Sequence, residues 1–144
     1  MKRLHCFKAY DIRGKIPEDL NTEFSYLIGV AYAEIINPGK VIIGYDVRLE
    51  SIELANSLIK GLTDLGVDII NIGLCGTEEV YFHTFTKEKE GVGGGIMITA
   101  SHNPKGYNGM KMVKSSAKPM SGIDGLKRIH DRVLDLSKTS NKVF

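Results

Sequence analysis

Short β-branched apolar runs alternate along this chain with longer stretches whose apolar residues recur at three- and four-residue spacing. The first pattern is typical of buried strands and the second of amphipathic helices. Their alternation predicts an α/β fold, a three-layer α/β/α domain with a mixed, largely parallel sheet. The length of 144 residues suits one such domain.

The expected elements follow from periodicity and from the residues that begin and end helices. We expect helices over 22–36, 51–65 and 123–136 and another beginning at Thr77, with strands over 41–45, 67–72, 96–99 and 110–113. The second helix is expected to bury one apolar face, made of Ile52, Ala55, Leu58, Ile59, Leu62 and Leu65. Glycines 93–95 are expected just ahead of a strand, at a point of close approach.

Charge and cysteine content exclude several classes of partner. Lys plus Arg exceeds Asp plus Glu by only two, 19 against 17, so no basic field indicates nucleic acid. Cys6 and Cys75 are far apart and lack the spacing of a metal knuckle, which favours a reducing compartment. No stretch has the length and apolar character of a membrane span. We therefore expect a cytoplasmic protein with no membrane or nucleic-acid partner.

The segment with the most chemical content follows the third expected strand, where residues 99–104 read Thr-Ala-Ser-His-Asn-Pro. Ligands of open α/β sheets bind outside the carboxyl ends of strands, so these polar groups are well placed for a site. Asn108 and Gly109 form a turn signal that would send the chain back and bring Lys111 near Ser101. A hydroxyl, a base candidate and a fixed cation suit transfer of an anionic group.

This segment has three other interpretations. Its composition fits a plain turn equally well, since every residue but His is favoured in turns. A serine hydrolase has less support, because Thr99 and Asn103 stand where a nucleophile elbow has glycines. A dinucleotide fold has little, because glycines 91 and 93–95 precede a strand instead of opening a helix.

Two further polar segments accompany the serine segment. Residues 7–14 read Phe-Lys-Ala-Tyr-Asp-Ile-Arg-Gly, and Arg13 could bind a phosphate through two N–H groups or simply pair with Asp11. Residues 44–48 read Gly-Tyr-Asp-Val-Arg. Asp46 and Arg48 point to one side of an extended chain, and we expect them to form a structural pair that supports the site loop.

Together these segments resemble the α-D-phosphohexomutases. The order and spacing of Tyr-Asp-Ile-Arg-Gly, Gly-Tyr-Asp-Val-Arg, Thr-Ala-Ser-His-Asn-Pro and Tyr-Asn-Gly-Met-Lys match the first domain of these enzymes over nearly the whole chain. The serine segment is the most specific of the four. Within the family, Thr77-Glu78 resembles the bacterial phosphomannomutases of GDP-mannose biosynthesis, whereas many relatives, including phosphoglucosamine mutases, carry Thr-Pro there.

The resemblance implies the catalytic residues. Ser101 would be a phosphoserine that exchanges its phosphoryl group with the sugar, and such a hydroxyl needs a base and charge neutralisation to react. His102 and Lys111 would line the catalytic site, with Lys111 transferring a proton or neutralising phosphoryl charge. The phosphate on Ser101 would be this chain's metal ligand, for Mg²⁺.

The same resemblance implies binding and supporting residues. Tyr10 and Arg13 would line the substrate cleft, with Arg13 on a phosphate. Asn103 would orient the loop and complete the substrate- and phosphate-binding set. Asp46 and Arg48 would be supporting residues.

As a whole, the resemblance implies an isomerase that interconverts mannose 6-phosphate and mannose 1-phosphate through a hexose 1,6-bisphosphate. Residues 1–136 would be its first domain and 137–144 the start of a linker. Later domains of the same polypeptide would supply an Asp-x-Asp-x-Asp loop for Mg²⁺ and the loops that select the phosphosugar substrate. The alternatives are a phosphoglucomutase or phosphoglucosamine mutase, a non-catalytic phosphosugar-binding module, and a purely structural interaction domain.

Overall fold

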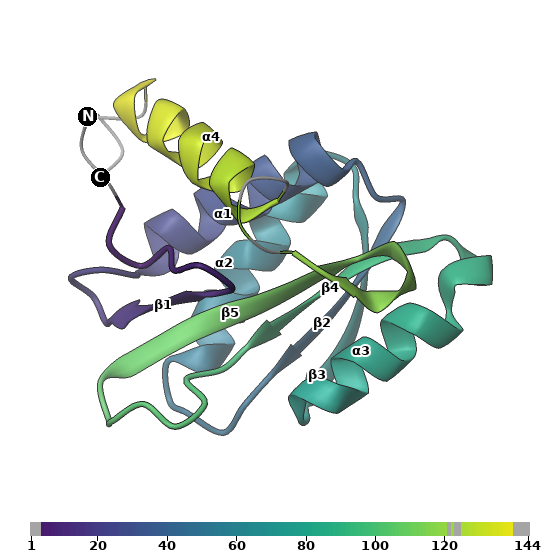
Figure 1. The fold of residues 1–144 in the computed structure, drawn as a ribbon, viewed down its shortest axis with the longest axis horizontal. Coiled ribbons are helices and arrows are strands. Elements are labelled where there is room, and N and C mark those ends of the chain that lie inside the picture. Colours follow the sequence, from purple (N-terminus) through teal and green to yellow (C-terminus); the bar gives the residue numbers. More distant parts are fainter. Residues whose placement is uncertain (1–3, 121, 123–124, 140–144) are drawn as a thin grey trace.

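The alternating pattern folds into one mixed sheet with helices on both faces, and the computed structural model describes residues 4–120, 122 and 125–139 (Figure 1). The strands are β1 (Ile12–Lys15), β2 (Lys40–Tyr45), β3 (Asp68–Leu74), β4 (Val92–Ile98), β5 (Tyr107–Lys114) and β6 (Lys118–Pro119). Within the described residues the strand order is β1-β5-β4-β2-β3, and β6 also pairs with β5. The helices are α1 (Thr22–Ile36), α2 (Ser51–Asp64), α3 (Thr77–Thr86) and α4 (Leu126–Thr139), with short 3₁₀ turns η1 (Glu88–Glu90) and η2 (Ser115–Ala117).

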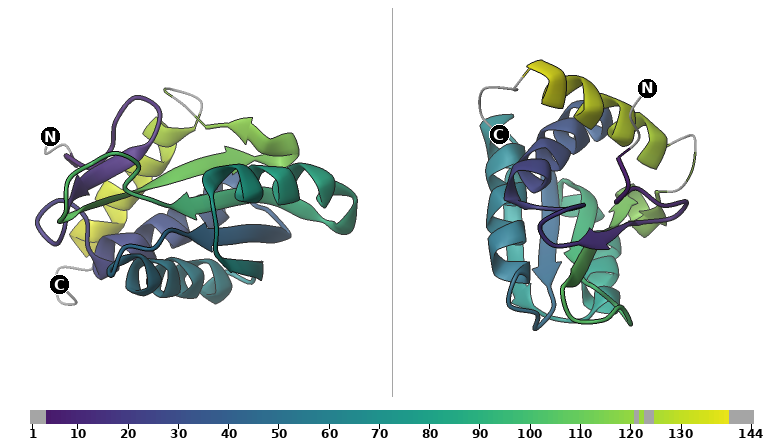
Figure 2. Two further views of the ribbon diagram at one scale, coloured as in Figure 1. Left: turned by 90° about the horizontal axis from the view of Figure 1, so that it is seen from below. Right: turned by 90° about the vertical axis from the view of Figure 1, so that its left-hand side faces the viewer.

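The expected three-layer α/β/α domain with a mixed sheet is confirmed. Helices α1, α2 and α4 cover one face of the sheet and α3 lies on the other (Figures 1 and 2). Strand β2 runs parallel to β3 and β4, whereas β5 runs antiparallel to β4, β1 and β6. The parallel part is therefore smaller than expected, because β4 and β5 are joined by a short loop, and such a connection gives antiparallel strands.

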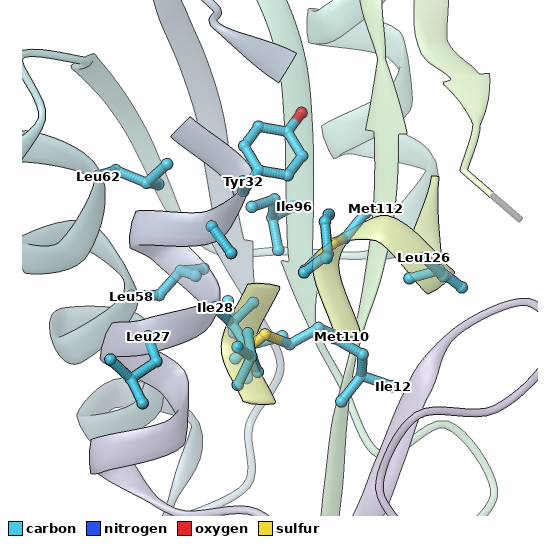
Figure 3. Close-up of a cluster of buried hydrophobic side chains, with 14 of the residues drawn as sticks. Ile12, Leu27, Ile28, Tyr32, Leu58, Leu62, Ile96, Met110, Met112 and Leu126 are labelled. Atoms are coloured by element: carbon cyan, nitrogen blue, oxygen red, sulfur yellow. The ribbon is translucent and has the colours of Figure 1, made fainter. Parts of the chain in front are cut away.

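The larger of the two apolar clusters lies between the sheet and the three helices on its first face. Figure 3 shows Ile28 and Tyr32 of α1 and Leu58 and Leu62 of α2 pointing toward Ile96, Met110 and Met112 of the sheet. The expected face of α2 was wrong at its ends, since Ile52 and Leu65 are 52% and 46% exposed. Leu54 is buried in their place, because the helix turns that side toward α1, where Ser25 Oγ donates to the Leu54 carbonyl.

Strand β4 begins at Val92, four residues earlier than expected, so glycines 93–95 lie inside it. A Cβ atom on Gly94 would lie 1.8 Å from the hydroxyl oxygen of Tyr32. That hydroxyl crosses the strand to donate to the Val113 carbonyl at 2.7 Å, and complete burial raises the pKa of Tyr32. Close approach is thus the reason for the glycines, but the approach occurs within the sheet.

Several element boundaries differ from the expectation. Strand β1 lies where no strand was expected, pairing Arg13 with Gly109 of β5. Helix α4 spans Leu126–Thr139, so 137–139 are helical although they fall in the expected linker. Residues 123–124 and 140–144 lie outside the described part, and the domain boundary after 136 stays a prediction. No helix among the described residues is long and apolar enough to span a membrane.

Replacing Gly94 with alanine should lower the free energy of unfolding by about 3 kcal/mol, because the added methyl forces Tyr32 out of place. Tyr32→Phe alone should cost about 1 kcal/mol through the lost hydrogen bond to Val113. The double variant should lose clearly less than the sum, since removing the hydroxyl makes room for the methyl. Urea unfolding of the four proteins measures this, and strict additivity would contradict the proposed crowding.

Candidate active site

The Ser101 loop, residues 99–106, connects β4 to β5 at the carboxyl end of β4. Ser101 is exposed and its backbone is left-handed, with φ of 53°, a conformation that non-glycine residues adopt uncommonly. Its N–H donates to Thr99 Oγ1 at 3.1 Å, and the side-chain amide of Asn103 donates to the Ala100 carbonyl at 2.9 Å. This local turn presents the Ser101 hydroxyl, which has no hydrogen-bond partner among the described residues.

The expected turn at Asn108 and Gly109 was wrong, because both residues lie inside β5. Asn108 is fully buried and its Nδ2 donates to Ser51 Oγ at 2.9 Å. A Cβ on Gly109 would lie 2.1 Å from the Ile12 carbonyl oxygen, so glycine allows β1 to pack closely. The reversal of the chain occurs within the Ser101 loop, where Gly106 has φ of 89°.

Asp46, one residue beyond β2, ties the Ser101 loop to the start of α2. Its Oδ1 accepts from Ser51 Oγ at 2.5 Å and from the Arg48 N–H at 3.1 Å. Its Oδ2 accepts from the Ala100 N–H at 3.1 Å. Burial by itself would raise the pKa of Asp46, but these donated hydrogen bonds outweigh burial and hold that pKa below its ordinary value.

Arg48 holds the second half of the Ser101 loop by donating hydrogen bonds to backbone carbonyl groups of that segment. One guanidinium nitrogen donates to the Pro104 carbonyl at 2.7 Å and to the Tyr107 carbonyl at 3.3 Å, and the other donates to the Asn103 carbonyl. No ion pair joins Asp46 to Arg48 in the described part of the chain. Asp46 and Arg48 therefore support the loop without an ion pair between their side chains: Asp46 accepts from N–H and hydroxyl groups, and Arg48 donates to carbonyls.

A second group of polar residues lies on the face of the sheet that carries α3. Met97 packs against α3, and its cross-strand neighbour on that face is Lys111. Gly109 shares the face with Lys111 and pairs with Arg13, which places Arg13 there too. We call Asp11, Arg13 and Lys111 the polar shelf.

The charges of the polar shelf are unequally engaged. Arg13 Nη2 lies 2.6 Å from Asp11 Oδ2, with side chains 36% and 14% exposed. Lys111 is half-buried, and its ammonium has neither a hydrogen bond nor an ion pair within the described residues. Its nitrogen is not sealed from solvent. An unpaired, accessible ammonium beside an arginine is suited to bind an anion.

Two of the expected residues are less constrained. His102 is exposed on the loop next to Ser101, and Tyr10 is 79% exposed ahead of β1. Neither side chain has a partner in the part of the chain that the structure describes.

Carboxylates near the loop do not form a metal cage. Among the described residues, no three His, Cys, Asp or Glu side chains are grouped to hold an ion. Asp46 is occupied by N–H and O–H donors and Asp11 by Arg13. These residues therefore do not fit a complete Mg²⁺ site.

Comparison with known proteins identifies this arrangement. A family model described as phosphoglucomutase/phosphomannomutase, alpha/beta/alpha domain I, matches residues 5–139. The chain belongs to the phosphoglucomutase/phosphomannomutase family. It is 56% identical over 129 residues to a phosphomannomutase of Klebsiella pneumoniae and, equally, to one of Escherichia coli.

The coverage of these relatives differs. The 129 matched residues are 90% of this chain, 80% of the Klebsiella protein and 28% of the Escherichia coli protein. A crystal structure of a phosphoglucomutase/phosphomannomutase family protein from Burkholderia thailandensis superposes with a TM-score of 0.84 at 33% identity, covering 94% of this chain and 31% of that one. The chain thus spans less than a third of the Escherichia coli and Burkholderia proteins and corresponds to domain I of the family.

Two residues that hold the Ser101 loop were not predicted from the sequence. Ser51 was interpreted only as the start of a helix, and Asn108 only as a turn residue. The structure places them in one chain of hydrogen bonds from Asn108 through Ser51 to Asp46. The alternation of β5 carries a signal for Asn108, which shares a face with buried Met110 and Met112.

Replacing Asp46 with asparagine should destabilise the domain at pH 7 by about 1–2 kcal/mol, because charge-assisted hydrogen bonds become neutral ones. The carboxylate's contribution is present above its unfolded pKa of about 3.9 and is lost as pH falls through the lower folded pKa. The stability gap between the two proteins should therefore narrow on acidification. Asp68→Asn, at an exposed residue, is the control, and a gap that is constant between pH 7 and 3 would contradict the interpretation.

Replacing Arg48 with lysine should loosen the loop without unfolding the domain, because an ammonium cannot span three carbonyls as a guanidinium does. Amide hydrogen exchange at Asn103 and Tyr107, whose N–H groups bond within the loop, should become about tenfold faster. Amides of α1 should keep their protection. Unchanged exchange in the loop would show that Arg48 does not hold it.

Proposed function

We propose that this chain is the phosphoserine-bearing first domain of a phosphomannomutase that interconverts mannose 6-phosphate and mannose 1-phosphate through a hexose 1,6-bisphosphate. The observation that carries the proposal is the Ser101 loop. Asp46 and Arg48 hold it through different groups, yet its serine is exposed and the hydroxyl has no partner among the described residues. A loop built only as a turn has no need of an exposed serine in a left-handed conformation.

The reaction consists of two phosphoryl transfers. A sugar hydroxyl attacks the phosphorus of phosphoserine 101, the bond from phosphorus to Oγ breaks, and a bond from phosphorus to the sugar oxygen forms. The proton of the sugar hydroxyl leaves to a base and the Ser101 oxygen gains one. The bisphosphate then returns its other phosphoryl group to Ser101 by the reverse process, which regenerates the phosphoserine.

Each remaining residue has a proposed role in these transfers. Lys111 transfers the proton or neutralises phosphoryl charge, and His102 assists beside Ser101. Arg13 binds phosphate, with Tyr10 on the same side of the site. Positioning and charge stabilisation dominate phosphoryl transfer, so several polar groups around one serine are expected.

The proposal includes parts that lie beyond this chain. Mg²⁺ would bind the phosphate on Ser101, with its other ligands in a later domain of the same polypeptide. Those domains would also select the hexose. The names of the relatives favour mannose phosphates over glucose or glucosamine phosphates, and the cytoplasmic location stays a prediction.

Ser101→Ala in the full-length protein should abolish mutase turnover, because it removes the hydroxyl that carries the phosphoryl group in the proposed reaction. The measurement is conversion of mannose 1-phosphate to mannose 6-phosphate with catalytic bisphosphate, and Ser57→Ala on α2 is the matched control. Turnover that survives Ser101→Ala would overturn the proposal. Turnover by residues 1–144 alone would overturn the need for later domains.

A further inference from the structure

Tyr81 of α3 stands beside the polar shelf, although neither the sequence motifs nor the proposed roles include it. Its ring packs against the cluster of Ile42, Val80, Val92 and Met97. Met97 is the cross-strand neighbour of Lys111. The helix therefore projects Tyr81 from above the same face of the sheet that carries the polar shelf.

The phenol hydroxyl of Tyr81 has no hydrogen-bond partner among the described residues. Among the described side chains, His83 Nδ1 is the one buried polar atom without a hydrogen-bond partner, so the Tyr81 hydroxyl is not a buried atom of this kind. The hydroxyl is consequently within reach of solvent while its ring is half-buried. A fixed ring with a free, accessible hydroxyl is organised to meet a polar ligand.

Charge near Tyr81 keeps this hydroxyl in the form that donates. Burial raises the pKa of Tyr81, and the nearby carboxylate of Asp11 raises it further. The same Asp11 is paired with Arg13, so Tyr81 and Arg13 lie near one and the same carboxylate. The phenol therefore stays neutral where an anion would bind, and it brings no negative charge to repel that anion.

We propose that Tyr81 is a substrate-binding residue of this site, whose hydroxyl donates a hydrogen bond to a phosphate oxygen of the sugar phosphate held by Arg13. The inference rests on the proposed function and adds a residue to it. Arg13 supplies charge and Tyr81 supplies a neutral donor fixed by packing. A phosphate has enough oxygen acceptors to take both at once.

Tyr81→Phe in the full-length protein keeps the ring and removes only the donor. KM for mannose 1-phosphate should rise about tenfold, as for one hydrogen bond to a charged group. The value of kcat should change by less than about twofold, because the contact is made in the ground state and in the transition state alike. The dissociation constant for mannose 1-phosphate, measured by calorimetry on the Ser101→Ala background, should rise by the same factor.

Tyr26→Phe is the matched control, since that hydroxyl donates to Asp64 at 2.7 Å between α1 and α2 on the opposite face. It should leave KM and the dissociation constant unchanged. Normal turnover with both constants unchanged in Tyr81→Phe would overturn the inference and leave the proposed function intact. If the unsubstituted full-length protein has no turnover but Tyr81→Phe weakens binding of mannose 1-phosphate, the proposed function would be overturned and Tyr81 would still be supported as a ligand-binding residue. A lowered unfolding temperature with an equal loss of kcat would indicate a structural role and overturn the inference.

Discussion

The carboxylate of Asp46 is the interaction on which the candidate site depends. It lies just past β2 and accepts hydrogen bonds from Ser51, the first residue of α2, and from Ala100 at the start of the Ser101 loop. The last ladder pair of the parallel strands β2 and β4 is Tyr45 with Ile98, and the Asp46 N–H donates to the Ile98 carbonyl at 3.0 Å. The half-buried carboxylate of Asp46 extends this connection past the strands to Ala100 and Ser51, and it thereby holds the start of the Ser101 loop.

Periodicity and capping residues were sufficient to predict most of the architecture. Asn21 accepts from the Phe24 N–H at 2.9 Å and begins α1 as expected. Patterns failed where tertiary contacts decide conformation. Gly94 and Gly109 look like turn or loop residues, but each lies inside a strand because another segment packs against its Cα. Strand β1 was missed for a related reason, since four residues paired at an edge carry too little periodicity.

In the candidate site too, the sequence predicts some features and tertiary contacts decide the others. The segment containing Ser101 was found because its residue types and spacing are unusual, and sequence alone carries that information. The supporting contacts were not found in detail, because Arg48 acts on backbone carbonyls and Asp46 on backbone N–H groups. Every residue has a backbone carbonyl and every residue except proline has an N–H, so no side-chain pattern marks them. Tyr81 was missed because a helical tyrosine at the edge of a core resembles any other packing residue.

Charge accounting explains why this arrangement suits one part of a larger site. A phosphoryl group on Ser101 would bring a charge of about −1.5 to −2. Arg48 donates to carbonyl groups, and Arg13 is paired with the carboxylate of Asp11. Lys111 is the unpaired cation of the polar shelf, so the shelf balances only part of that charge. The remainder has to be balanced by groups outside the polar shelf, such as exposed Lys105 of the Ser101 loop or residues beyond a chain that spans 28% of the Escherichia coli relative.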